Sequence, residues 1–419
     1  MKIKFYLTNI LLAGLTYSIY GQDTTKAKPQ PPEEEFKPSG KFSGQVFADF
    51  QYKVSSPDSA NLLGWGSKAQ YAFGNGYDNK YSSFEFRRIY LGYDYNITEK
   101  FNAQFLLSHE GNTGLDAAGQ RSMYIKAANI RWKNIFKGTD AVFGQQQAPA
   151  WATFTEAIYG HRWVEKTISD MRGLASSNDF GFSLQGKYKD GKVGYEAMVG
   201  NDNAGKPEND NFKKFYGNIW AKFLNKRLIL DLYSDYALTQ LSPNGAGLEH
   251  STKSKLLSKA FIAWQQEQFT IGAEIMAGEW KNYSFHQDTA KVPDGSKKDT
   301  VSVKPFGISF FGKAVLLKKK VNDKNAPLLA LFVRYDMYNP DKNYNSALIY
   351  TSTSYHISET FYTVGIDYSP IPNFHIMPNI WVNSYKENAP ITTPNGVAIK
   401  GMQKHGNDIN YRLTMFWKF

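Results

Sequence analysis

A strict two-residue alternation at the end of the chain constrains the fold most. In the segment 408–419 (DINYRLTMFWKF), the odd positions from Ile409 to Phe419 are apolar or aromatic. The even positions are polar, with Phe416 the one exception. A period of two is the period of a β-strand, whose side chains point alternately to opposite faces. The segment therefore predicts a strand with one apolar face and one mainly polar face.

The same alternation recurs along most of the chain. Many of the segments are near ten residues long, which is the length that a tilted strand needs to cross a bilayer, whereas strands of soluble proteins average five or six residues. The sixteen predicted strands cover 41–54, 83–95, 101–110, 121–133, 140–148, 179–189, 192–200, 214–224, 227–239, 253–265, 268–279, 303–317, 326–338, 357–368, 373–385 and 408–419.

The connections between these strands alternate in length. Short ones such as 96–100 and 225–226 are followed by long ones such as 111–120 and 240–252. Short turns at one end and long loops at the other are typical of outer-membrane barrels. We therefore predict an all-β fold, a transmembrane up-and-down antiparallel β-barrel of about 16 strands (16–18) with short periplasmic turns and long extracellular loops.

Composition supports a membrane barrel and excludes other classes. No run of 18 apolar residues occurs, which excludes helical membrane spans. Aromatic residues make up 16% of the chain, as the aromatic girdles of lipid-facing barrels require. The chain has no cysteine, which excludes a disulfide scaffold, thiol catalysis and thiolate metal sites.

The N-terminal segments predict export. Residues 1–21 have a basic start at Lys2 and Lys4 and an apolar stretch before Gly21, which predicts a signal peptide. Residues 22–39 are rich in proline and acids and predict a disordered periplasmic linker, too short for the plug of an active transporter. The barrel domain is then 40–419. Removal of Lys2 and Lys4 lowers the formal net charge from +11 to +9, which in an exported protein favours anionic solutes or lipids over nucleic acid.

Four cations lie on strands whose other face is apolar. They are predicted to point into the lumen, because a charge on the lipid face at mid-bilayer depth costs about 2–4 kcal/mol. Such cations would favour anions in a pore. The alternative is that each is neutralised by an acid on a neighbouring strand or on its own strand. The four cations are Arg88, Lys187, Arg334 and Arg412.

The loop 149–178 is long for a connection without secondary structure, and such loops are usually functional. Within it, the segment 162–174 changes to a helical period, with apolar residues from Trp163 to Leu174 on one face and polar ones on the other. We predict a short helix folded into the barrel mouth, with a basic face that lines a constriction. That face carries Arg162, Lys166 and Arg172. The alternative is an outer helix that lies on a neighbouring subunit or on lipopolysaccharide.

Enzymatic and metal-binding patterns are weak. The seven histidines are scattered without a pair at metal-ligand spacing, and neither a nucleophile-elbow nor a P-loop motif occurs. Oxygen ligands alternate in the segment 341–345, but without the later Gly and Glu they favour a polar turn over a calcium site. We predict no enzyme, no cofactor and no metal. A distant Ser/His pair for lipid hydrolysis stays open.

Five segments resemble a known family of porins. They are 84–95 (FEFRRIYLGYDY), 142–147 (VFGQQQ), 179–188 (DFGFSLQGKY), 334–339 (RYDMYN) and 361–373 (FYTVGIDYSPIPN). In order and spacing they resemble the phosphate-selective porin O and P family in its Bacteroidetes-type form. The resemblance implies a trimeric sixteen-stranded barrel of the outer membrane whose third outer loop folds inward. It also implies that Arg162, Lys166 and Arg172 line a constriction for phosphate or other small anions, and that Arg88 lines the lumen.

These observations together predict a porin for passive diffusion of small hydrophilic solutes, biased to anions, with phosphate as one candidate solute. Only nine of the 49 basic residues are arginine, and lysine lacks the bidentate fork that suits phosphate, so general anion diffusion is favoured. The alternatives are a barrel enzyme acting on lipid or sugar, a non-conducting structural or adhesive barrel, and a channel for hydrophobic substrates. Expected partners are the solutes, outer-membrane lipid and lipopolysaccharide, and further copies of the chain in a homotrimer.

Overall fold

A computed structural model of the chain describes residues 36–55, 80–111, 116–150, 155–208, 210–240, 252–287, 298–344, 357–387 and 407–419. The predicted signal peptide (1–21), residues 22–35 of the predicted linker and parts of the long outer loops lie outside the described residues. Residues from Pro38 to Phe419 form one compact unit. No helix in the described part of the chain is long and apolar enough to cross a bilayer.

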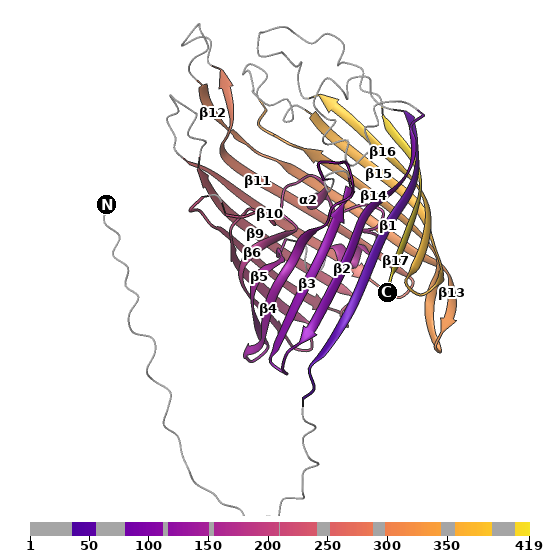
Figure 1. The fold of residues 1–419 in the computed structure, drawn as a ribbon. Coiled ribbons are helices and arrows are strands. Elements are labelled where there is room, and N and C mark those ends of the chain that lie inside the picture. The colour runs from indigo at the N-terminus through magenta and orange to yellow at the C-terminus, as the bar shows by residue number, and fades with distance from the viewer. Residues whose placement is uncertain are drawn as a thin grey trace, which may run out of the picture. The chain divides into compact units, whose positions relative to one another are not determined.

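The unit is a closed antiparallel β-barrel (Figure 1). Apart from β12 and β13, each strand pairs with its neighbours in the sequence, and β1 pairs with both β2 and the last strand, β17, which closes the barrel. The strands are β1 (Ser39–Ser55), β2 (Ser82–Asn96), β3 (Phe101–Glu110), β4 (Tyr124–Phe136), β5 (Thr139–Gln147), β6 (Asn178–Tyr188), β7 (Val193–Gly200), β8 (Lys214–Phe223), β9 (Leu228–Gln240), β10 (Thr252–Gln265), β11 (Phe269–Gln287), β12 (Lys298–Val303), β13 (Phe306–Val321), β14 (Lys324–Asn339), β15 (Ile357–Ile371), β16 (Phe374–Glu387) and β17 (Asp408–Lys418).

Two of these strands, β12 and β13, together occupy one strand position of the barrel. β12 and β13 both pair with β11, one after the other, and Pro305 lies between them. Proline has no N–H to donate to a ladder, so the strand is interrupted there. When β12 and β13 are counted as one strand, the barrel has sixteen strands. The predicted all-β antiparallel barrel is therefore confirmed.

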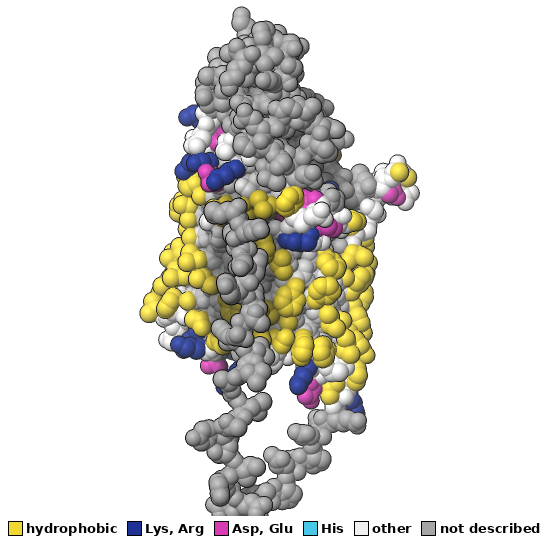
Figure 2. Space-filling view, turned by 90° about the vertical axis from the view of Figure 1, so that its left-hand side faces the viewer, with side chains coloured by type: hydrophobic (Ala, Val, Ile, Leu, Met, Phe, Trp, Pro, Cys, Tyr) yellow, Lys and Arg dark blue, Asp and Glu magenta, His cyan; other side chains and the backbone are white. Residues whose placement is uncertain are grey.

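Apolar side chains cover the outside of the barrel. Figure 2 shows them as a band between levels at which charged side chains gather. Phe105, Ile219, Leu232 and Val333 are among the large apolar residues of this face, and each is exposed. Such a band is what a barrel presents to the hydrocarbon of a membrane.

The β13–β14 hairpin is longer than the sequence predicts. We expected a connection over 318–325, but the pairing continues to Val321 and Lys324, and only Asn322 and Asp323 form the turn. Both turn residues have positive φ (46° and 62°), as a two-residue hairpin turn with type I′ geometry requires. The lysine-rich composition of 318–320 favours a loop, whereas the strand register continues through it.

The connection between β5 and β6, residues 148–177, folds into the barrel and is called the inner loop below. It contains α1 (Thr155–Tyr159), which contacts β10 and β11, and α2 (Ile168–Met171), which contacts β13 (Figure 1). Residues 151–154 of this loop lie outside the described residues. The predicted helix over 162–174 is wrong in extent, because only Ile168–Met171 is helical. The reason lies in the partners that the backbone carbonyls of this segment find in the barrel wall.

Candidate functional site

Apolar side chains seat the inner loop against the inside of the barrel. Val164 and Met171 are fully buried against inward-facing side chains of β1, β2 and β14–β17. These wall residues are Phe47, Tyr90, Phe332, Phe361, Met377, Trp381 and Phe416. Phe416 is the residue that broke the alternation of the last strand. It faces inward and stacks on Trp163 of the inner loop, with ring centroids 4.4 Å apart and planes at 12°.

The other side of the inner loop packs on the opposite strands. Ile168 and Leu174 are buried with inward-facing residues of β7–β14, among them Met198, Leu257 and Met276. The predicted apolar face of the segment 162–174 therefore does bury its apolar members, although the segment is not one helix. The loop is held on two sides by side chains that replace water with apolar contact.

Four wall arginines bind the backbone of the inner loop, and we call them the arginine clasp. Arg87 and Arg88 come from β2, Arg334 from β14 and Arg412 from β17, and their exposed fractions are 7%, 5%, 4% and 3%. Each guanidinium donates a hydrogen bond to at least one backbone carbonyl between residues 162 and 166.

The clasp bonds cover four carbonyls. Arg88 donates to the carbonyl of Arg162 (3.3 Å) and Arg87 to that of Trp163 (3.0 Å). The carbonyl of Val164 accepts from both Arg412 (3.1 Å) and Arg87, and Arg334 donates to the carbonyl of Lys166. Carbonyls turned toward the wall are poorly placed for intrahelical bonds, which explains why the helix begins only at Ile168.

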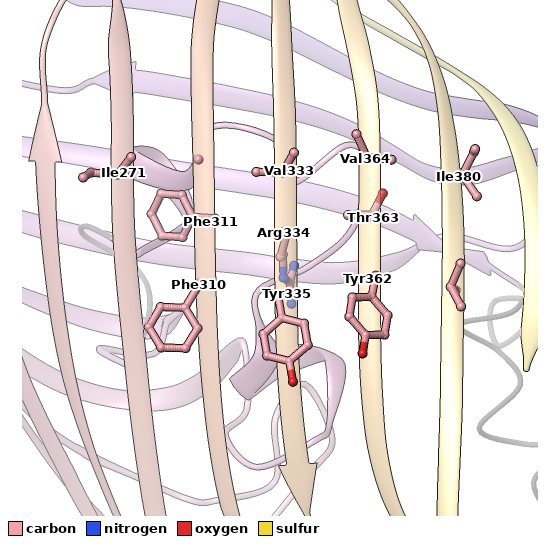
Figure 3. A pocket seen from close by; sticks show the side chains of 12 residues that line it. Ile271, Phe310, Phe311, Val333, Arg334, Tyr335, Tyr362, Thr363, Val364 and Ile380 are labelled. Carbon is pink, nitrogen blue, oxygen red and sulfur yellow. The ribbon is translucent and has the colours of Figure 1, made fainter.

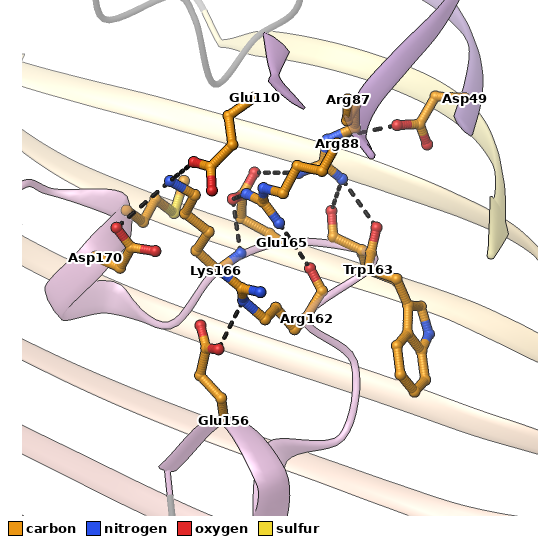
Figure 4. Close-up of polar contacts among 12 residues, drawn as sticks. Asp49, Arg87, Arg88, Glu110, Glu156, Arg162, Trp163, Glu165, Lys166 and Asp170 are labelled. Atoms are coloured by element: carbon orange, nitrogen blue, oxygen red, sulfur yellow. Dashed lines mark hydrogen bonds and ion pairs between the residues drawn. The ribbon is translucent and has the colours of Figure 1, made fainter. Parts of the chain in front are cut away.

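Buried carboxylates neutralise the clasp (Figure 4). Asp49 of β1 lies 2.6 Å from Arg412 and 3.4 Å from Arg87. Glu165 of the inner loop lies 2.9 Å from Arg87, and it also lies 3.6 Å from Arg88. The Arg412 guanidinium further covers the indole of Trp381, 3.9 Å from the ring centroid. These charges are desolvated and paired, so they bind the loop and are not available to a passing solute.

Three of the predicted lumen cations therefore lie under the loop. Arg88, Arg334 and Arg412 point inward, as the alternation predicts, but the loop covers them. Arg334 is paired with Asp336 two residues along its own strand (Nε to Oδ1, 2.9 Å), which is the alternative that the sequence left open. Their position is that of groups that hold a loop in place.

Sequence reasoning missed Arg87. Strict alternation places Arg88 inward and Arg87 in the lipid. A bulge opposite Phe47 and Ala48 inserts one extra residue, so that both arginines point inward. The signal was present in the sequence, because two consecutive arginines on a lipid-crossing strand cannot both leave the lipid without such a bulge.

The predicted basic residues of the inner loop are also paired (Figure 4). Arg162 lies 2.6 Å from Glu156. Lys166 lies between Glu110 of β3 (3.5 Å) and Asp170 (3.4 Å), and Arg172 pairs with Glu359 of β15. The side chains of Arg162 and Lys166 are 20% and 16% exposed, so they line the uncovered side of the loop. The polar face that we predicted also included Glu165 and Ser169, which are instead buried.

Burial sets the pKa values of the acids in the inner loop. Burial raises the pKa of Glu156, and the nearby Arg162 only partly offsets this. For Glu165, burial alone would raise the pKa, but Arg87 and Arg88 outweigh it and hold the pKa below its ordinary value. Glu165 is therefore an ionised partner of the clasp.

A histidine ties the start of this segment to the wall. His161 Nε2 lies 3.4 Å from Asp367 of β15, whose other oxygen accepts from His375 of β16 at 2.7 Å. The His161 ring stacks on Phe332 (4.5 Å between centroids). Burial lowers the pKa of His161 below its ordinary value despite the nearby carboxylate of Asp367. The loop contact is therefore built around the neutral imidazole.

Lys187 occupies a different kind of site. It lies on the inner face of β6 and is exposed, and no acid in the described residues lies within ion-pair distance of it. It lines a polar cavity of about 240 Å³ on the inner face of β3–β8, with Gln104, Arg131, Gln185 and Glu196 among its neighbours. We call this surface the open wall and the inner faces of β1, β2 and β14–β17 the clasp wall.

A second hollow lies outside the barrel. It has a volume of about 580 Å³ over β11 and β13–β16, and Figure 3 shows Phe310, Val333, Tyr335 and Val364 around it. Phe310, Val333 and Val364 belong to the exposed apolar face. The hollow suits the hydrocarbon chains of a bilayer and not a hydrophilic solute.

Comparisons with known proteins place the fold. No family model matches the chain, and no curated protein matches it in sequence. The outer membrane channel DcaP of Acinetobacter baumannii is similar in structure, with a TM-score of 0.57, 12% identity, and 92% of this chain and 99% of that chain covered. An anion-selective porin from Comamonas acidovorans has a TM-score of 0.55 and 10% identity over 91% of this chain and 100% of that chain. A trimer form of OmpT from Vibrio cholerae has a TM-score of 0.52 and 12% identity over 91% and 99%.

These similarities define a class. The chain has the β-barrel fold of outer-membrane porins and channels. The barrel, its outward apolar band and these neighbours indicate a protein of the bacterial outer membrane.

Proposed function

We propose that the protein is an outer-membrane porin through which small hydrophilic solutes diffuse passively. The observation that carries this proposal is the asymmetry of the lumen. The inner loop is bound to the clasp wall, whereas the open wall keeps exposed polar side chains such as Gln104 and Lys187 in the barrel interior. A wide barrel narrowed on one side by an infolded loop suits diffusion of solutes smaller than the remaining passage.

We further propose a weak preference for anions. The paired network around the loop holds equal numbers of cations and carboxylates, so an excess of positive charge lies outside it. The cations are Arg87, Arg88, Lys126, Arg162, Lys166, Arg172, Arg334 and Arg412, and the carboxylates are Asp49, Glu110, Glu156, Glu165, Asp170, Asp336, Glu359 and Asp367. Lys187 adds a positive charge on the open wall. Since nearly every arginine is already bound, phosphate is expected to pass as one anion among several. This differs from strict phosphate selectivity as in the phosphate-selective porin O and P family.

A homotrimer is the oligomeric state that we propose. One structural neighbour is described as a trimer form, and the outward apolar band leaves room for contacts between barrels as well as with lipid. Every residue of the arginine clasp and its acid partners comes from one chain. We infer that each barrel forms its own constriction, so that a trimer would have three separate passages.

Single-channel recording tests these proposals. The purified protein is inserted into a planar bilayer under a KCl gradient, and the sign of the reversal potential gives the ion preference. We expect steady conductance with a small anion preference that decreases in the double variant Arg162→Ala/Lys166→Ala. Lys318→Ala/Lys320→Ala, on the β13–β14 hairpin and away from the inner loop, is the matched control and should leave the reversal potential unchanged.

Other outcomes would separate the alternatives. Open channels with a cation preference would keep the porin and remove the anion proposal. The absence of conductance from folded protein would remove the porin proposal. It would favour a barrel enzyme acting on lipid or sugar, or a structural barrel whose lumen the inner loop blocks.

A further inference from the structure

Side-chain amides lie on neighbouring strands of the open wall. Gln104 of β3 donates to Asp94 (3.2 Å) and accepts from Asn129 of β4 (3.3 Å). Gln185 of β6 accepts from Arg131 (2.8 Å) and donates to Glu196 of β7. These hydrogen bonds fix the orientation of the amides in the barrel interior.

The amides keep hydrogen-bonding capacity toward the lumen. A carboxamide has two N–H donors and a carbonyl with two lone pairs, and the bonds above use one of each for Gln104. Asn129 donates to Gln104 and to the carbonyl of Gln145, and Gln185 donates to Ser183 and Glu196, so these two amides keep only acceptor capacity. Gln104 is exposed and Asn129 is half-buried. The cavity therefore offers donors and acceptors side by side, which is the pairing that a hydroxyl group needs because it both donates and accepts.

The charges around the cavity largely cancel. Arg131 is bound to Asp140 at 2.9 Å as well as to Gln185. Lys187 and Glu196 line the same cavity with opposite signs, and Gln185 donates to Glu196 at 3.0 Å. This cavity therefore binds a charged solute little more strongly than an uncharged one of the same size. A dedicated anion site would need a net positive charge.

An apolar surface completes the cavity. Trp220 of β8 faces inward and is 7% exposed, because it packs in an apolar cluster with Tyr159 of the inner loop. Its indole borders the cavity and lies against the backbone of β7 at Gly194. A Cβ atom at Gly194 would come within 2.3 Å of that indole, so the close approach requires glycine. An aromatic side chain beside polar amides matches a molecule with C–H groups on one face and hydroxyl groups around its edge.

We propose that this cavity of the open wall is a binding subsite for a neutral polyhydroxylated solute, with room for one sugar ring. Its volume of about 240 Å³ is below the range of pockets for drug-sized ligands, about 300–1,000 Å³. Gln104 donates to and accepts from hydroxyl groups, Asn129 and Gln185 accept from them through their side-chain carbonyls, and Trp220 contacts the C–H face. The inference rests on the proposed porin function and adds a class of solute to it.

Current block by glucose tests the subsite. Glucose is added to single open channels in a planar bilayer, and the current is compared with that expected from the lower conductivity of the glucose solution alone. We expect an additional, saturable reduction. In Gln104→Leu the half-blocking concentration should rise about 2- to 10-fold, the effect of losing one or two hydrogen bonds. Asn102→Leu is the matched control, a second amide on the same strand that does not line the cavity, and should not change the block.

Folding and specificity are checked in the same experiment. Gln185→Leu tests a second amide, and unchanged conductance without glucose shows that each variant is folded. Open channels whose current follows only the bulk conductivity would overturn the sugar subsite and leave the porin proposal intact. Saturable block by inorganic phosphate in place of glucose would also overturn it, because the cavity would then be an anion site. The absence of channels would remove both proposals.

Discussion

The clasp wall and the open wall are built from the same kind of strand but have different tasks. Both carry polar and charged side chains on their inner faces. On the clasp wall these side chains are buried and bind loop carbonyls, as Arg412 does with Val164. On the open wall Gln104 and Lys187 stay exposed. The comparison shows that an inward position only takes a charge out of the lipid, whereas coverage by the loop decides whether the charge contributes to stability or to transport.

The largest expected effect is on the clasp wall. Arg412→Ala removes the nearer of the two arginines beside the buried Asp49 and leaves only Arg87 at 3.4 Å, and breaking a buried pair costs about 3–5 kcal/mol. The free energy of unfolding should fall by that amount. It is measured by urea titration of the protein folded in liposomes, with tryptophan fluorescence as the readout. Lys187→Ala on the open wall is the matched control, with a change of about 0.5 kcal/mol or less. Equal losses in the two variants would contradict the division into two walls.

The next largest effect is expected from acid, which should weaken the docking of the inner loop on the clasp wall. The pKa of His161 is lowered by burial from its ordinary 6.5, so the docked loop favours the neutral ring and loses stability as the pH falls below 6.5. Asp367, Lys313 and the imidazole of His375 are the ionisable groups around this ring. We expect channel noise to increase between pH 7 and pH 5, and His161→Gln to remove this step.

A second acid step should follow at lower pH. The pKa of Glu165 is held below its ordinary 4.5 by Arg87 and Arg88 against the effect of burial, so its contribution is present above pH 4.5 and is lost as the pH falls through the lowered pKa. Burial raises the pKa of Glu156, and this group acts in the opposite direction because acid favours its buried neutral form. Noise that is constant across both ranges would show that the loop is held by its apolar contacts alone.

The smallest effect on stability, and the one most specific to transport, is expected on the open wall. Lys187→Glu reverses an exposed charge in the lumen and should move the reversal potential toward cations by several millivolts, with an unfolding free energy within about 0.5 kcal/mol of the wild type. Lys320→Glu on the β13–β14 hairpin is the control. A shift in the control as large as that in Lys187→Glu would mean that net charge, and not position in the lumen, sets the preference.

The sequence predicts the barrel well because the information is local. Alternation within each strand and the lengths of the connections identify all sixteen strand positions, and these are sufficient to predict the confirmed barrel fold. The apolar side chains Val164, Ile168, Met171 and Leu174 of the inner loop are also predicted as one face, and all are buried. Burial follows from side-chain type, which can be seen in a single segment.

The partners of the charged residues could not be predicted in this way. Asp49 and Arg412 lie 363 positions apart, and their contact depends on the register of β1 with β17. The short extent of α2 depends on arginines from three other strands. Each of these features arises from pairing between distant segments, which a single sequence does not specify.

The pairing of β1 with β17 also determines when the inner loop can dock during folding. Arg412 donates one hydrogen bond to Asp49 and another to the carbonyl of Val164, and these bonds join β1 and β17 to the middle of the chain. Contacts between such distant segments form slowly, because long stretches of chain must first be brought together. The clasp can be complete only after the last strand has joined the first. Docking of the inner loop therefore requires a closed barrel. Before closure, the strands would surround a wider passage that the loop does not narrow.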